Sequence, residues 1–84
     1  MPTTEDFKAE LEAELIRAEK RGAPSVEINS GELHRAVGGY PSPDHRMPAC
    51  CGAMYAEQRS TDHILSRPEQ GKGASLTIRY KLPR

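Results

Sequence analysis

The clearest periodic pattern of hydrophobic and polar positions lies near the N-terminus. Its apolar residues recur at spacings of four, four and three, in the order Phe7, Leu11, Leu15 and Ala18. Because this spacing places them on one face of a helix, we expect an amphipathic helix over residues 4–20. Thr3 or Thr4 can cap its N-terminus, and Gly22 follows its end.

A second helix is predicted after a short extended run, residues 25–28. Asn29 and Glu32 have the spacing of a capping box, in which two residues at a helix start bond each other's backbone amides. We therefore expect a short helix over residues 30–37. It would end at the glycine pair 38–39, which suits a left-handed C-terminal cap.

The third predicted helix has two contrasting faces. It is expected to begin near Pro48, because proline suits the first position of a helix, and to run to about Gln58. One face carries the larger, mainly apolar side chains of Met47, Cys50, Cys51, Met54 and Tyr55. The opposite face carries small residues, namely Ala49, Gly52, Ala53 and Ala56. Such a smooth face suits close contact with the first helix or with a partner protein.

The C-terminal third predicts two strands. Residues 63–66 read as a short strand, and in residues 74–82 apolar and polar positions alternate as in a half-buried strand. The connecting residues 67–73 (RPEQGKG) are rich in turn formers. The whole pattern predicts a single α+β domain over residues 1–84, with three helices and a small antiparallel sheet that ends in a β-hairpin.

Length and composition restrict the class of protein. A chain of 84 residues can bury one small core, and no apolar run approaches the roughly 18 residues that a membrane helix needs. The N-terminus is acidic and lacks an apolar signal core, and two adjacent cysteines cannot form a disulfide framework. We therefore expect a cytoplasmic domain with no membrane partner.

The formal net charge is zero, but the charges are unevenly distributed. Six acidic and three basic residues give residues 1–20 a net charge of −3, whereas nine basic and six acidic residues give residues 21–84 a net charge of +3. Such asymmetry can mark a surface that meets phosphate or an acidic partner. A solvated helix beside a solvated strand explains it equally well.

The predicted order of elements resembles the winged helix-turn-helix fold, in which the first strand joins the terminal hairpin to make a three-stranded sheet. Separately, the strings EINSGELHRAVGGYP, HRMPACCGAM and GASLTIRYKLPR are similar to segments of short uncharacterised bacterial proteins. Similar segments also lie beside HNH-type endonuclease domains. This chain lacks room for a nuclease part. The resemblance therefore implies a non-catalytic module, regulatory or associated with a restriction or nuclease system.

The winged-helix resemblance implies DNA binding, with roles assigned by position. The third helix would present its N-terminal end to the major groove, and residues 67–73 would form the wing beside a phosphate strand. The candidate nucleic-acid contacts are the basic residues in and around these elements: Arg35, His45, Arg46, Arg59, Arg67, Lys72, Arg79 and Lys81. The small-residue face of the third helix favours an alternative, because it offers no side-chain hydrogen bond for reading bases. That alternative is a docking module for a protein partner or a homodimer.

Other chemistry receives less support from the sequence. Cys50 and Cys51 fall in the first turn of the third helix, where amide donors can lower a thiol pKa and suit a redox sensor. Burial as small hydrophobic residues is the preferred interpretation. His34 is expected to face solvent beside Arg35. No histidine or cysteine pair has zinc-finger spacing, and no hydrolase triad is supported. We therefore expect no metal, cofactor, catalytic residue or small-molecule substrate.

Overall fold

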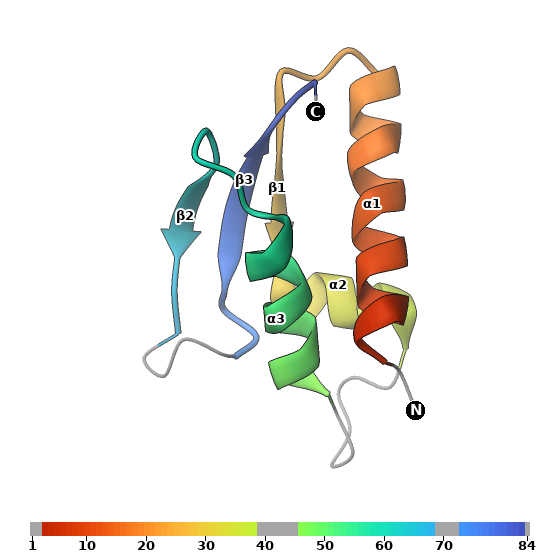
Figure 1. The fold of residues 1–84 in the computed structure, drawn as a ribbon, viewed down its shortest axis with the longest axis vertical. Coiled ribbons are helices and arrows are strands. Elements are labelled where there is room, and N and C mark those ends of the chain that lie inside the picture. The colour runs from red at the N-terminus through yellow and green to blue at the C-terminus, as the bar shows by residue number, and fades with distance from the viewer. Residues whose placement is uncertain (1–2, 39–45, 69–72, 84) are drawn as a thin grey trace.

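The structure is a computed structural model that describes residues 3–38, 46–68 and 73–83 (Figure 1). Within these ranges the chain forms three helices and three strands, in the order α1 (Thr4–Lys20), β1 (Ser25–Asn29), α2 (Ser30–Val37), α3 (Met47–Glu57), β2 (His63–Ser66) and β3 (Thr77–Lys81). The α+β class and the order of elements predicted from the sequence are confirmed.

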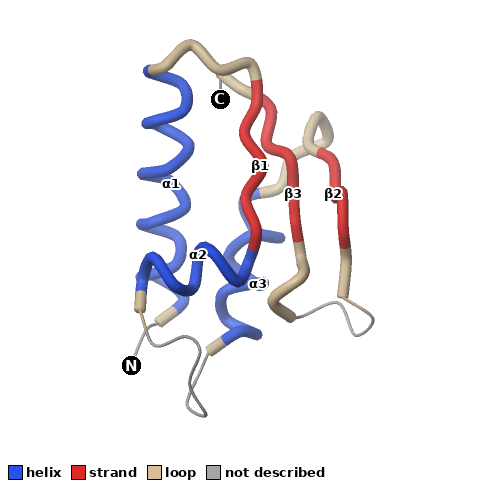
Figure 2. Tube along the Cα trace, turned by 180° about the vertical axis from the view of Figure 1, so that it is seen from behind, coloured by secondary structure: helices blue, strands red, loops and turns tan. Residues whose placement is uncertain are grey.

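The strand β3 lies at the centre of an antiparallel sheet whose order is β1-β3-β2 (Figure 2). Ile78 of β3 pairs with Ile28 of β1 and with Ile64 of β2. The strand begins later than predicted, since the carbonyl oxygens of Ala74 and Leu76 accept hydrogen bonds from the start of α2. The sheet ladder is therefore shorter than the alternating pattern of the sequence.

The helices cover one face of the sheet, and the other face is open to solvent. Along β3, buried Ile78 and Tyr80 alternate with exposed Arg79 and Lys81. The helix α3 lies over the buried face, and α1 lies beside β1 (Figures 1 and 2). The Tyr80 hydroxyl donates a hydrogen bond to the Met54 carbonyl oxygen at 2.8 Å, which joins β3 to α3 inside the core.

Side-chain caps fix the starts of α1 and α2. Thr3 and Asp6 form a complete capping box at α1. At α2 the Asn29 side chain accepts a hydrogen bond from the Glu32 amide at 3.1 Å, as its spacing predicts. Gly38 caps the C-terminus of α2 with φ 113° and ψ 167°, a positive φ that favours glycine, and its amide donates to the His34 carbonyl oxygen at 2.8 Å.

The small-residue face of α3 is partly covered, as one of the two contacts predicted for it allows. Only 1% of the surface of Ala53, a residue of this face, is exposed. The helices α1 and α3 are in contact, and a small side chain lets two helix backbones approach closely. Ala53 therefore belongs to the core.

Candidate nucleic-acid interface

The segment that enters β3 is held by the first turn of α2. Ser30 donates its amide to the Leu76 carbonyl oxygen at 2.8 Å, and Gly31 donates its amide to that of Ala74 at 3.3 Å. The Ser30 hydroxyl also donates to the Gly73 carbonyl oxygen. These contacts fix the chain at the base of the connection between β2 and β3.

Two thiols from the first turn of α3 complete this junction. The Cys51 thiol donates to the Gly73 carbonyl oxygen and the Cys50 thiol to that of Ser30, each at 3.4 Å. Both residues are buried. Burial and then the neighbouring Cys51 raise the pKa of the Cys50 thiol to about 12. The alternative of a lowered thiol pKa at this helix start is therefore wrong for Cys50, and the preferred prediction, burial as a small hydrophobic residue, is confirmed.

His34 links α2 to the start of α3, although the sequence indicated a solvent-facing residue. Its side chain is fully buried, and its ring meets the ring of Phe7 edge to face at a centroid distance of 4.8 Å. Its Nε2 accepts a hydrogen bond from the Arg46 amide at 2.9 Å. The imidazole thus serves as an acceptor at a helix start that has no side-chain cap of its own.

Two of the candidate arginines lie at one end of the molecule, which we call the hairpin end. Arg46 is the N-cap residue of α3, and Arg67 directly follows β2. The Cys51 contact brings the start of α3 to the segment that enters β3. The end of β2 also meets the start of β3, because Ser66 pairs with Thr77. Both arginines are exposed, and Figure 1 shows these element ends on the same side.

Arg59 and Lys81 lie at the opposite end, which we call the Asp62 end. Arg59 follows the C-terminus of α3, and Lys81 is the last residue of β3. The buried carboxylate of Asp62 accepts hydrogen bonds from both backbone amides, from Arg59 at 2.7 Å and from Lys81 at 2.8 Å. These two candidates therefore do not extend the charge of the hairpin end.

The two remaining described candidates form ion pairs. On the open face of the sheet, an Arg79 guanidinium nitrogen lies 3.4 Å from a Glu27 carboxylate oxygen of β1. On α2, the corresponding Arg35–Glu32 distance is 3.6 Å. His45 and Lys72 lie outside the described residues. The eight basic candidates do not form one patch, because at least six of them are spread over both ends and two surfaces.

The outward side of α3 offers few polar groups. Pro48 and Ala56 are exposed, and a Cβ atom built on Gly52 would meet nothing within 4 Å. Ala49 and Tyr55 are half-buried at the margins. This surface permits close approach of another backbone, but it cannot read base edges through several side chains.

His34 and Asp62 are the positioning residues that sequence reasoning missed. Asp62 stands three residues after Arg59, a spacing at which a carboxylate can reach back to a backbone amide. That local signal was present in the sequence. The burial of His34 depends on the packing of α1 against α2 and carries no comparable local signal.

Comparison of the chain with protein-family models, with curated proteins and with solved structures finds no match. Among the described residues, no three histidine, cysteine, aspartate or glutamate side chains are placed to hold a metal ion. None of the described helices combines the length and apolar character needed to cross a bilayer.

Proposed function

We propose that this protein is a non-catalytic DNA-binding module of winged-helix type that grips the phosphate backbone. The observation that carries the proposal is the element order α1-β1-α2-α3-β2-β3 with the strand order β1-β3-β2. This topology sets the start of α3 beside the hairpin, where a winged helix presents its recognition helix and its wing.

The chemistry of the hairpin end supports backbone contacts rather than base reading. Arg46 and Arg67 are exposed there, and arginine binds phosphate oxygens through its planar fork of donors. The small residues on the outward side of α3 allow close approach but supply no code for bases. Binding should therefore discriminate weakly between sequences and weaken steeply with salt. The similar bacterial segments favour a cytoplasmic, regulatory or nuclease-associated setting.

A matched pair of double variants tests this proposal. Arg46→Ala with Arg67→Ala removes two charges from the hairpin end, and Arg59→Ala with Lys81→Ala removes two from the Asp62 end. The backbone bonds to His34 and Asp62 are kept in both, because they use main-chain amides. In a salt series with mixed-sequence duplex DNA, we expect the first variant to reduce the salt slope by about 1.8. The second should leave the slope nearly unchanged.

Equal effects of the two double variants would contradict the assignment to the hairpin end. If the wild-type chain does not bind the duplex even at low salt, the proposal of DNA binding is itself contradicted. Circular dichroism of each variant controls for folding, since all four side chains are exposed.

A second candidate function is protein docking through the outward side of α3. It is favoured by the space around Gly52 and by exposed Pro48 and Ala56, which form a smooth patch without charge. Ala56→Arg places a charged side chain on this patch without disturbing the core. If the chain forms a homodimer through this patch, sedimentation should show a dimer. Ala56→Arg should then raise the dissociation constant of that dimer at least about tenfold. A dimer insensitive to this change, or a wild-type monomer, contradicts homodimer docking.

A further inference from the structure

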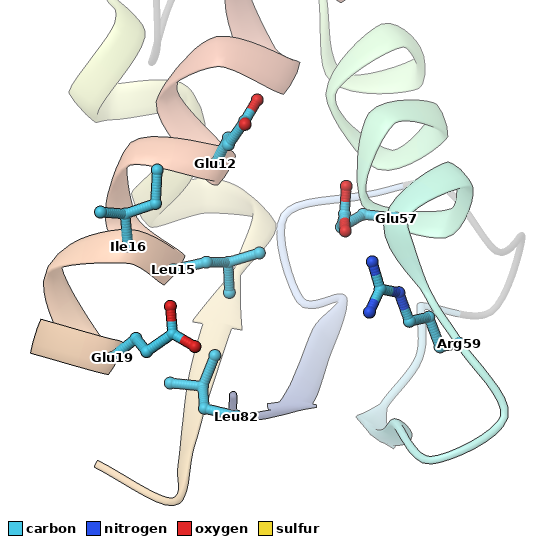
Figure 3. Close-up of a pocket in the computed structure, with 7 residues that line it drawn as sticks. All are labelled: Glu12, Leu15, Ile16, Glu19, Glu57, Arg59 and Leu82. Carbon is cyan, nitrogen blue, oxygen red and sulfur yellow. The ribbon is translucent and has the colours of Figure 1, made fainter. Parts of the chain in front are cut away.

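We propose that a groove between α1 and the end of α3 is a docking site for a basic, aliphatic peptide segment of a partner protein. The groove has a volume of about 290 Å³. In Figure 3 its two walls are α1 and the chain that leaves α3, with Leu82 at the base. Its position toward the C-terminal ends of α1 and α3 separates it from the hairpin end, so it is independent of the proposed DNA contact.

The floor of the groove is aliphatic. Leu15 and Leu82 line it from the edge of the core, and Ile16 beside them leaves 44% of its surface exposed. The described residues contain two such exposed large hydrophobic side chains, and the other is Leu65. An aliphatic side chain of a partner would remove Ile16 from water and gain free energy in proportion to the area buried.

The rim of the groove is acidic. Glu12 and Glu19 lie on the α1 wall, and Glu57 lies opposite beside Arg59 (Figure 3). Three carboxylates against one guanidinium give the rim a formal charge of −2. The other charged residues of segment 1–20, four acidic and three basic, add a net charge of −1. An anionic ligand, nucleic acid included, is disfavoured here, whereas lysine or arginine is attracted.

The combination of floor and rim selects the occupant. A volume of about 290 Å³ lies just below the range of about 300–1,000 Å³ typical of small-molecule pockets. It suits one or two side chains of a protein partner. Charge complementarity with the rim requires a cationic residue, and the floor requires an aliphatic neighbour. The partner segment therefore carries lysine or arginine beside leucine, isoleucine or valine.

The test uses the full chain and three synthetic peptides, followed by amide chemical shifts. The probe is Gly-Leu-Lys-Leu-Arg-Gly. In one control peptide glutamate replaces both basic residues, and in the other serine replaces both leucines. Of the three peptides, we expect only the probe to bind with measurable affinity. Its binding should shift the amide signals of α1 and of residues around Glu57 and Leu82, and its affinity should fall as salt is raised.

Two variants and one matched control locate the binding. Ile16→Ser should reduce the affinity for the probe by about three- to tenfold, and so should the double variant Glu12→Gln with Glu19→Gln. Leu65→Ser removes a hydrophobic side chain of equal exposure, 43%, from outside the groove and should leave binding unchanged. All four substituted side chains are exposed, so the variants should stay folded.

Every other outcome overturns the inference. If millimolar probe shifts no amide signals, the groove is not a binding site. If the serine peptide binds as well as the probe, the binding is non-specific charge attraction. Equal binding of the acidic peptide removes the charge argument. If Leu65→Ser loses as much affinity for the probe as Ile16→Ser, or if the shifts centre on the hairpin end, the probe binds outside the groove. Self-association that requires Ile16, without probe binding, assigns the groove to a second copy of this chain.

Discussion

His34 shows how a single side chain can prepare a site that it does not enter. Its buried imidazole accepts the Arg46 amide at 2.9 Å, at the N-terminus of a helix that has no side-chain cap. Free amides at a helix start must be satisfied by some acceptor, and here the acceptor comes from a different helix. The direction of α3 and the place of Arg46 are thereby tied to α2.

Glu14 is a second residue whose surroundings set its chemistry. One of its carboxylate oxygens, Oε2, is buried and has no hydrogen-bond partner among the described residues. Burial raises the pKa of Glu14, Glu10 and Glu32 raise it further, and Arg17 opposes them. The folded chain therefore holds the proton more tightly than the unfolded chain does. The cost to stability is absent below the ordinary pKa of 4.5 and grows as pH rises through the raised value.

Glu14→Gln should consequently stabilise the protein at neutral pH, by less than about 1 kcal/mol because solvent screens a half-exposed charge. The gain should disappear as pH falls below 4.5. Urea unfolding of wild type and variant across this pH range measures the difference. Glu12→Gln, at an exposed position of the same helix, is the control. A gain independent of pH, or a loss at neutral pH, would show that burial of the charge is not the cause.

At the scale of elements, the short helix α2 organises the fold more than its length suggests. Its first turn holds the segment that enters β3, and its last turn holds the start of α3 through His34. The approach is close enough that a Cβ atom on Gly31 would lie 3.2 Å from the Ala74 carbonyl oxygen. Glycine is thus required for contact between two backbones rather than for helix formation.

Two glycine-to-alanine substitutions in helices should therefore have opposite signs. Gly31→Ala should destabilise the protein by about 1–2 kcal/mol, since overpacking against backbone outweighs the gain in helix propensity. Gly52→Ala should stabilise it by up to about 1 kcal/mol, because nothing lies within 4 Å of the added methyl group. Thermal and urea unfolding measure both. Stabilisation by both substitutions would mean that the contact of α2 with Ala74 is loose.

The same scale explains what the sequence could predict. The 4-4-3 spacing of α1 and the Asn29–Glu32 spacing are local patterns, and both elements form where expected. The small residues of α3 predicted a contact with the first helix as one alternative, and Ala53 is buried. His34 is buried against a helix distant in sequence, so local order could not place it. The arrangement of the candidate basic residues was harder still to predict from the sequence. The Arg79–Glu27 pair depends on strand register across 52 positions, and Arg59 and Arg67 are separated only once α3 and the hairpin are placed.

At the scale of the whole molecule, the structure separates two surfaces of different charge. The hairpin end presents Arg46 and Arg67, while the groove between α1 and the end of α3 is acidic. A polyanion attracted to one is repelled by the other, which would orient the domain on DNA and leave the groove accessible. The zero net charge of the chain conceals this arrangement.

The most direct test of DNA binding through the hairpin end is a titration of the isotope-labelled chain with mixed-sequence duplex at low salt. We predict that amide signals of the first turn of α3 and of residues 73–76 shift, while those around Asp62 and the groove do not. Absence of shifts, or shifts centred on the Asp62 end, would contradict the proposal.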